Sequence, residues 1–248
     1  MNALSQPQAA APRAGSRRRT ARFTTRAAVA TPSTPLDALA DALRNLLPGS
    51  AGARVTAKAA LFEAIEGLQR GVTASPEQQA EVDACARALE RLNPNPASLK
   101  AGCINGRWEL MYTTSVSILG STRPPFLRPL GPIYQTIDAR RLRAKNQETS
   151  PFFSSVTAEL TPTSKSGVNV QFKTFRLLGF IPVTAPEAAK GSLDTTYVDS
   201  EVRISRGNKA NLFVLVQRDP DAELDDDEFE TGFAFGSKLT EKSVREFR

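Results

Sequence analysis

The second part of the chain predicts strands with no helices between them. From residue 104 on, short runs rich in β-branched and aromatic residues are mostly separated by Gly, Pro, Asn or Asp, which is typical of strands and turns. Parallel strands need crossovers of a dozen or more residues, and most of these connections are too short for one. We therefore expect an antiparallel barrel or a strongly rolled sheet. The expected strands are 107–114, 133–138, 140–146, 155–161, 168–176, 192–199, 201–206 and 211–217.

The first of these strands contains the only tryptophan of the chain, Trp108. The large apolar residues Trp108, Leu110 and Tyr112 alternate with other types, and a period of two predicts a strand with two unlike faces. Gly106 directly before the strand permits a tight turn of the backbone. A Gly-x-Trp start is similar to that of lipocalins, in which an indole closes one end of a small barrel. We expect Trp108 to be buried as such a plug.

A second informative stretch, residues 191–215, predicts a strand, a tight corner, a second strand, a hairpin and a third strand. Arg203 and Arg206 lie on opposite faces of the middle strand. An arginine directed into a barrel is costly unless it stacks or pairs, and an indole is a good partner for a guanidinium. We assign Arg206, with Trp108, to the lining of the barrel cup.

Aromatic residues on three expected strands could complete this lining. The predicted ligand-binding residues are Trp108, Tyr112, Tyr134, Phe172 and Arg206. The alternative is an ordinary packed core, because an eight-stranded barrel has room only for side chains or for one small ligand. Side-chain volumes cannot be assembled from the sequence, so both interpretations stay open at this point.

Two long connections, 115–132 and 177–190, are unusually apolar. Exposed apolar loops are costly in water, so such segments either fold over the barrel mouth or contact an apolar surface. Within them, the predicted membrane-contact residues are Phe126, Leu127, Phe180 and Ile181.

The segment before the strands predicts a helical layer. Apolar residues at helical spacing indicate helices over 36–47, 55–70 and 75–92. In the third helix, Ser75, Pro76 and Gln78 have the spacing of a capping box with proline at the first helical position. Gly71 is expected to end the second helix. These amphipathic faces are best explained by packing on a core.

The two ends of the chain differ from the middle. Residues 1–35 contain six arginines and no acid, and this composition predicts a chloroplast transit peptide, with a disordered basic arm as the alternative. The leader accounts for the whole net charge of +6, so the basic excess does not indicate nucleic-acid binding. Residues 219–248 begin with a run of acids and are expected to be a disordered tail.

Several kinds of chemistry are excluded or unsupported. The chain has no histidine, which excludes Ser-His-Asp and Cys-His nucleophiles and histidine-bearing zinc sites. Two cysteines, Cys85 and Cys103, cannot form a cysteine-only zinc site, and whether they pair is open. The glycines form no phosphate-binding motif, and no apolar run is long enough to span a membrane. We therefore expect no metal and no cofactor.

Between Lys58 and Val216 the sequence closely resembles the plastid lipid-associated proteins, or plant fibrillins. The resemblance lies in five ordered blocks: Gln-Arg-Gly at 69–71, Leu-Glu-Arg-Leu-Asn-Pro at 89–94, Gly-Arg-Trp-Glu-Leu-Met-Tyr-Thr-Thr-Ser at 106–115, Gly-Pro-Ile-Tyr-Gln at 131–135, and 197–216 with Arg-Ile-Ser-Arg-Gly at its centre. It implies a lipocalin-like barrel, location in plastids, association with plastoglobules or thylakoids, and binding or organisation of lipids and prenyl compounds. The acidic tail departs from the family pattern.

Together these observations predict an α+β, mainly antiparallel fold. A lipocalin-like barrel over 104–218 is expected to carry an N-terminal helical layer over 36–92, both within one plastid lipid-associated domain, 36–218. The expected function is non-enzymatic: the protein binds a lipid or prenyl molecule and contacts a peripheral lipid surface in the chloroplast, without nucleic acid as a partner. The alternatives are a structural lipid-droplet coat protein with a filled barrel and, less favoured, a barrel enzyme acting on an apolar substrate.

Overall fold

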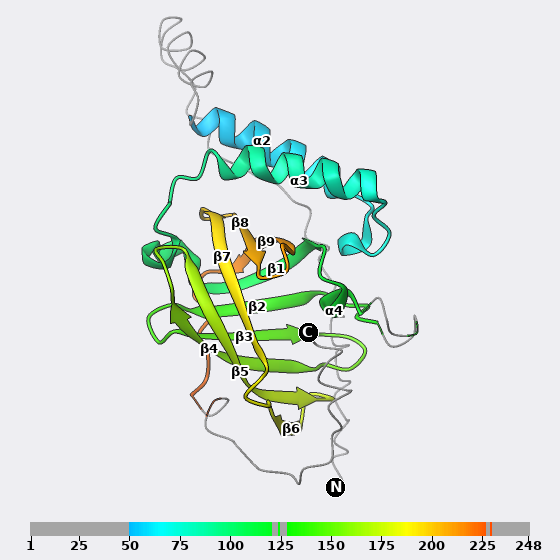
Figure 1. The fold of residues 1–248 in the computed structure, drawn as a ribbon, viewed down its shortest axis with the longest axis vertical. Helices are drawn as coiled ribbons and strands as arrows, with labels where there is room; N and C mark the ends of the chain where they lie inside the picture. Colours follow the sequence, from blue (N-terminus) through cyan, green and yellow to red (C-terminus); the bar gives the residue numbers. More distant parts are fainter. Residues whose placement is uncertain (1–49, 121–123, 125–127, 227–228, 230–248) are drawn as a thin grey trace, which may run out of the picture. The chain divides into compact units, whose positions relative to one another are not determined.

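The computed structural model of the protein describes residues 50–120, 124, 128–226 and 229 (Figure 1). The expected leader, the helix over 36–47, Phe126 and Leu127 lie outside these residues. The helices are α2 (Ala51–Ile65), α3 (Pro76–Glu90) and α4 (Val116–Leu119), and the strands are β1 (Gly106–Thr113), β2 (Ile133–Asp138), β3 (Arg143–Glu148), β4 (Ser155–Pro162), β5 (Gly167–Leu177), β6 (Ile181–Thr184), β7 (Lys190–Val198), β8 (Val202–Gly207) and β9 (Leu212–Asp219).

Eight of the strands close into an antiparallel barrel. The pairing runs β1–β2–β3–β4–β5–β7–β8–β9, and β9 pairs with β1 to complete the ring. Closure removes the unpaired edges that an open sheet would expose. The expected lipocalin-like barrel is confirmed, with each predicted strand present within a few residues of its predicted ends.

One strand was not expected. The connection 177–190 was predicted without a strand, but it contains β6, which pairs with the far half of β5 from Thr174 to Leu177. The near half of β5, Gly167–Gln171, pairs with β7 instead. Because β5 is longer than its barrel neighbour β7 on this edge, its far half is open to pairing, and the proline-containing β6 fits the edge position.

A bulge in β1 changes the direction of Tyr112. The register with β9 shifts between Leu110 and Tyr112. Trp108 and Leu110 pack together in one core cluster, whereas Tyr112 packs in another with residues of α2 and α3. The extra residue of a bulge reverses the alternation of the side chains beyond it. The expectation that Tyr112 lies on the same face as Trp108 is therefore wrong.

The two long helices pack on the outer side of the barrel, over β7, β8 and β9 (Figure 1). Leu61 of α2 and Leu89 of α3 are fully buried in the same cluster as Tyr197 and Ile204. This confirms a helical layer on the barrel. The cluster covers apolar side chains on the outer faces of these strands, which would otherwise be exposed to water.

The ends of the helices follow local signals, with one difference from expectation. At α3 the Ser75 side chain accepts from the Gln78 backbone N–H, and the Gln78 side chain accepts from the Ser75 N–H, so the capping box is confirmed. Helix α2 ends at Ile65, not near Arg70 as expected. Gly67 two residues later has φ +75°, a left-handed conformation that a helix cannot continue through.

An ion-pair group connects α2 to the β7–β8 corner. Lys58 lies 2.6 Å from the Asp199 carboxylate and 2.8 Å from that of Glu201. Burial by itself would raise the pKa of Asp199, but Lys58, the Tyr197 hydroxyl and two backbone N–H groups together lower it below its ordinary value. Asp199 is therefore ionised at neutral pH and fixes both the helix and the corner.

Two further features were left open by the sequence. Cys85 and Cys103 are both free thiols, so they do not pair. The first part of the acidic segment contacts the barrel: Leu224 is buried, and Asp226 lies 2.6 Å from Arg143 on β3. Most of the remaining tail lies outside the described residues.

Candidate functional site: a cavity inside the barrel

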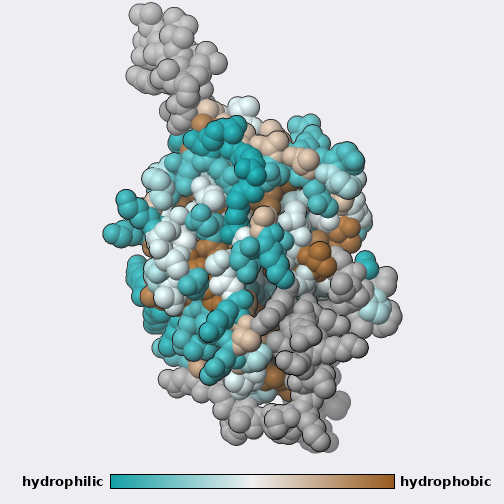
Figure 2. Space-filling model, viewed as in Figure 1, coloured by the Kyte–Doolittle hydropathy of each residue, from teal (hydrophilic) through white to brown (hydrophobic). Residues whose placement is uncertain are grey.

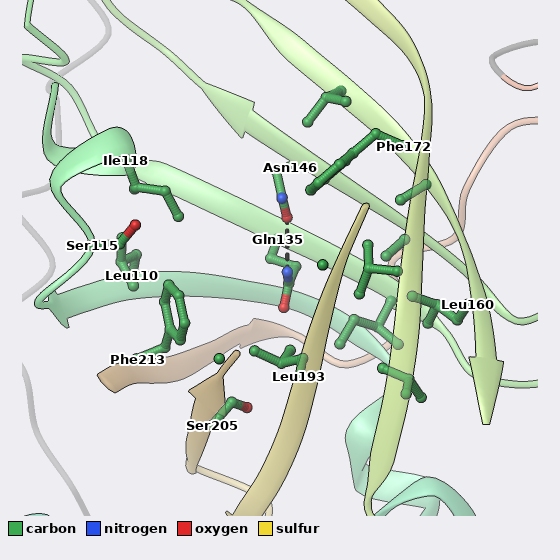
Figure 3. A pocket seen from close by; sticks show the side chains of 18 of the residues that line it. Leu110, Ser115, Ile118, Gln135, Asn146, Leu160, Phe172, Leu193, Ser205 and Phe213 are labelled. Atoms are coloured by element: carbon green, nitrogen blue, oxygen red, sulfur yellow. Dashed lines mark hydrogen bonds between the residues drawn. The ribbon is translucent and has the colours of Figure 1, made fainter. Parts of the chain in front are cut away.

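The barrel encloses a cavity of about 630 Å³ (Figure 3). Its walls are predominantly apolar and come from most of the strands; representative side chains are Leu110, Ile137, Ala158, Leu160, Phe172 and Leu193. A volume in the range of small-molecule sites, with apolar walls and a few polar groups, is typical of a ligand cavity. The interior is therefore not completely filled by side chains.

Beside this cavity, Trp108 and Arg203 form a buried stacked pair inside the barrel. Trp108 is fully buried, and its indole N–H donates to the Ile104 carbonyl oxygen at 3.0 Å. The Arg203 guanidinium carbon lies 5.0 Å from the centre of the Trp108 ring, within cation–π distance. Burial lowers the pKa of Arg203 to about 9, so the guanidinium remains charged at neutral pH.

Two amide side chains continue from this pair into the cavity. Arg203 donates through Nη2 to Gln135 Oε1, and Gln135 donates through Nε2 to Asn146 Oδ1 at 2.8 Å. Gln135 on β2 pairs directly with Trp108 on β1 and with Asn146 on β3, so one row of the sheet places all three side chains. Figure 3 shows Gln135 and Asn146 directed toward each other.

The five predicted lining residues occupy different positions. Phe172 lines the cavity. Tyr134 also belongs to the lining, but its ring lies under the Arg107 guanidinium at 4.1 Å, on the strand face opposite Gln135. Trp108 is fully buried, as expected, and lies next to the lining rather than in it. Tyr112 packs against the helices, as described above.

Arg206 does not point into the cavity. Its guanidinium contacts both Glu90 oxygens, at 2.8 and 3.0 Å, and Asp83 at 2.7 Å, all on α3. The inward arginine of β8 is Arg203, and Ser205 on the same face lines the cavity. The assignment of Arg206 to the cup is therefore wrong, because the helical layer supplies its acidic partners on the outside of the barrel.

Sequence reasoning missed Gln135 and Asn146 and chose the wrong arginine. Val202 and Ile204, the apolar residues of β8, face the helices and not the cavity. The usual rule that the apolar face of a strand points inward fails where a second layer covers its outer face. The only available signal for Arg203 was its position opposite the apolar face of the same strand.

A second feature is an exposed apolar patch at the β5–β6 turn. Its members are Phe153 from the β3–β4 connection, Leu178, Phe180 and Ile181, with exposed fractions of 56%, 49%, 71% and 41%. A Cβ at Gly179 would lie 3.6 Å from that of Phe153, so the two loops are adjacent. We call these four residues the hairpin patch. On the face shown in Figure 2, hydrophobic residues appear in small areas among hydrophilic ones.

The cavity and its buried tryptophan define this protein as a closed lipocalin-like barrel with an internal apolar site. The family model PAP_fibrillin matches residues 55–216, more than half of the chain. The chain therefore belongs to the PAP/fibrillin family of plastid lipid-associated proteins.

Relatives agree with this membership. The chain is 49% identical over 173 residues to probable plastid-lipid-associated protein 5, chloroplastic, of Arabidopsis thaliana, across 69% of this chain and 74% of that protein. It is 29% identical to plastoglobulin-1, chloroplastic, of Pisum sativum, across 64% of this chain and 60% of that protein. It is 28% identical to the chromoplast-specific carotenoid-associated protein C1 of an Oncidium hybrid cultivar, across 64% of this chain and 68% of that protein.

These relatives are chloroplastic or chromoplastic, which confirms the expected plastid location. Their names describe lipid or carotenoid association and not an enzymatic activity. Among the helices that the structure describes, none has the length and hydrophobicity needed to cross a bilayer. The described part of the chain contains no group of three or more His, Cys, Asp or Glu side chains that could hold a metal.

Proposed function

We propose that the protein binds the apolar chain of a plastid lipid or prenyl compound inside the barrel. The observation that carries this proposal is the cavity of about 630 Å³ with predominantly apolar walls. Transfer of a hydrocarbon chain from water into such walls is worth roughly 0.8 kcal/mol per methylene. Part of that gain is offset by the lost freedom of the ligand. The carotenoid and plastoglobule names of two relatives support the same ligand class.

The cavity also favours this proposal over the coat-protein alternative. A coat protein needs only an outer surface, and its barrel could be filled with side chains. Here the small residues Ala144 and Ala158 on β3 and β4 line free space. An unfilled apolar volume costs stability, so its presence supports a ligand that occupies it.

Replacement of Ala158 by Phe is expected to abolish most ligand binding, because the new ring occupies the cavity. Ala158 is 3% exposed and lines the cavity wall. The full-length protein and its variant are incubated with a plastid lipid extract, purified again and extracted, and the bound lipids are quantified by mass spectrometry. We expect roughly a tenfold lower content of prenyl or acyl lipid in the variant. The matched control is Ala59→Phe, which places the same ring on an exposed position of α2.

Two results would contradict the cavity as the binding site. One is equal lipid content in the Ala158→Phe variant and the wild type. The other is an equal loss in Ala59→Phe, which would indicate general damage or nonspecific adsorption. Circular dichroism spectra recorded on each sample verify that the barrel is folded.

We also propose that the hairpin patch contacts a lipid surface. It contains Phe180 and Ile181, two of the four residues predicted for this role; Phe126 and Leu127 lie outside the described residues. Phe180, at 71% exposed, has the largest exposed fraction among the exposed large hydrophobic residues of the described chain. Outside the basic leader the net charge is zero, so apolar insertion rather than charge is expected to provide the binding energy.

The Phe180→Asp variant is expected to bind vesicles roughly tenfold more weakly than the wild type. A buried Phe side chain gains about 1.5 to 3 kcal/mol, and an aspartate at the same position cannot insert. Flotation of the full-length protein with vesicles of galactolipid and phosphatidylglycerol measures the bound fraction. The control is Val55→Asp, because Val55 on α2 is 66% exposed but distant from the patch in sequence and fold. Unchanged flotation of Phe180→Asp would exclude the patch as the contact.

A further inference from the structure

Arg203 is a buried cation inside the barrel. Its side chain is fully buried, and its Nε and Nη1 atoms have no hydrogen-bond partner among the described residues. It also forms no ion pair within that part of the chain. Its hydrogen bond is the one from Nη2 to Gln135 Oε1. A guanidinium has only donors, so it fixes the orientation of the Gln135 amide with the oxygen toward Arg203.

The orientation of the Gln135 amide also sets the orientation of the Asn146 amide. With its oxygen committed to Arg203, Gln135 presents its NH₂ group, which donates to Asn146 Oδ1 at 2.8 Å. The Asn146 oxygen is thereby engaged, and its Nδ2 group is left without a hydrogen bond to any described residue. Asn146 lines the cavity, on the inner face of β3 (Figure 3). The arginine therefore determines that this part of the apolar wall presents a donor.

We propose that the cavity selects an apolar chain whose polar end is a hydrogen-bond-accepting oxygen, of a carbonyl or a carboxylate, and that Asn146 Nδ2 donates to it. This inference rests on the proposed function, because it specifies which apolar chains the same cavity prefers. Glu148, the next inward residue of β3, also lines the cavity. A pure hydrocarbon would leave the Asn146 donor unsatisfied in an apolar wall.

The test compares three probes of equal chain length: 2-undecanone, undecane and undecanoate. Binding to the full-length protein is followed by calorimetry and by the fluorescence of Trp108, the only tryptophan. We expect the ketone to bind roughly three- to tenfold more tightly than the alkane, the equivalent of one hydrogen bond. In the Asn146→Leu variant, ketone and alkane should bind equally. The control is Asn169→Leu on β5, an exposed asparagine outside the cavity lining, which should keep the preference.

An infrared spectrum of bound 2-undecanone gives a readout that a purely structural role of Asn146 would not move. In the wild type the carbonyl stretching band should lie at a lower wavenumber than in Asn146→Leu, because a hydrogen bond weakens the C=O bond. The undecanoate probe tests the rim, where the exposed Lys190 and Lys209 also line the cavity. Carboxylate binding that is stronger than ketone binding and insensitive to Asn146→Leu would place the head group there and overturn the assignment.

The remaining outcomes are distinguishable. Equal binding of ketone and alkane to the wild type overturns the role of Asn146 while leaving an apolar binding cavity in place. If the Asn146→Leu variant still binds the ketone more tightly than the alkane, the role of Asn146 is overturned as well. If neither chain binds to the wild type, the proposed function itself fails, and the head-group assignment fails with it.

Discussion

The Trp108→Ala variant is expected to lose about 3 to 5 kcal/mol of unfolding free energy, a large share of the roughly 5 to 15 kcal/mol of a typical domain. The ring is fully buried and packs with Leu110, Val198 and Leu215. Its removal leaves a cavity beside the existing one. It also takes away the face on which the Arg203 guanidinium stacks, so that a buried cation loses one of its two partners.

Urea unfolding followed by far-ultraviolet circular dichroism measures this loss, since the variant has no tryptophan fluorescence. The control is Trp108→Phe, which keeps an aromatic face for Arg203 but loses the hydrogen bond to Ile104. The free energy of unfolding of Trp108→Phe should lie between those of Trp108→Ala and the wild type. A Trp108→Ala protein with an unchanged free energy of unfolding would show that the indole is not a structural plug of the barrel.

The barrel was predictable because its signals are local. Short strands with period-two patterns are separated mostly by turn residues, and their number and spacing exclude a parallel sheet. The capping box of α3 was also predictable, since Ser75 and Gln78 lie three residues apart. Strand β6 was not, because Ile181–Thr184 is short and contains a proline. What makes it a strand is the unpaired far half of β5, which depends on the length of the neighbouring β7.

The orientation of residues within the barrel was less predictable. Arg206 and Tyr112 were both assigned to the interior, and both face the helices. For Tyr112 the cause is the bulge after Leu110, which has no distinct sequence signal. For Arg206 the cause is the helical layer. Its residues Glu90 and Asp83 form ion pairs with Arg206 on the outer face of β8.

The polar row of the candidate site could not be predicted for a different reason. Gln135 and Asn146 are ordinary polar residues on two β strands, and in the sequence they look like solvent-facing positions. Their significance arises only from the register that sets Trp108, Gln135 and Asn146 side by side. Arg203 then orients both amides. Cross-strand pairing of this kind is a property of the closed barrel and not of any one segment.

The second large effect on stability is expected at Gly106, where β1 begins. Gly106 has φ +95°, and a Cβ at this position would lie 2.4 Å from the Asp219 carbonyl oxygen and 2.7 Å from Pro220 Cα. Both obstacles are backbone atoms at the end of β9, so neither can move without disturbing the pairing of β1 with β9. Replacement by Ala should therefore lower the unfolding free energy by about 2 to 4 kcal/mol through strain and clash.

Glycine at position 102 provides the matched control for this experiment. It lies four residues earlier, and a Cβ there would meet no atom within 4 Å. Gly102→Ala should therefore stay within about 0.5 kcal/mol of the wild type in the same urea titration. If Gly106→Ala changed the unfolding free energy as little as Gly102→Ala, the close crossing of β1 over Asp219–Pro220 would not exist as described. The tight turn that brings Trp108 into the barrel would then need another explanation. If both variants were strongly destabilised, the loss could not be assigned to the crossing, because Gly→Ala at an unstrained site is expected to stabilise the protein by restricting the unfolded chain.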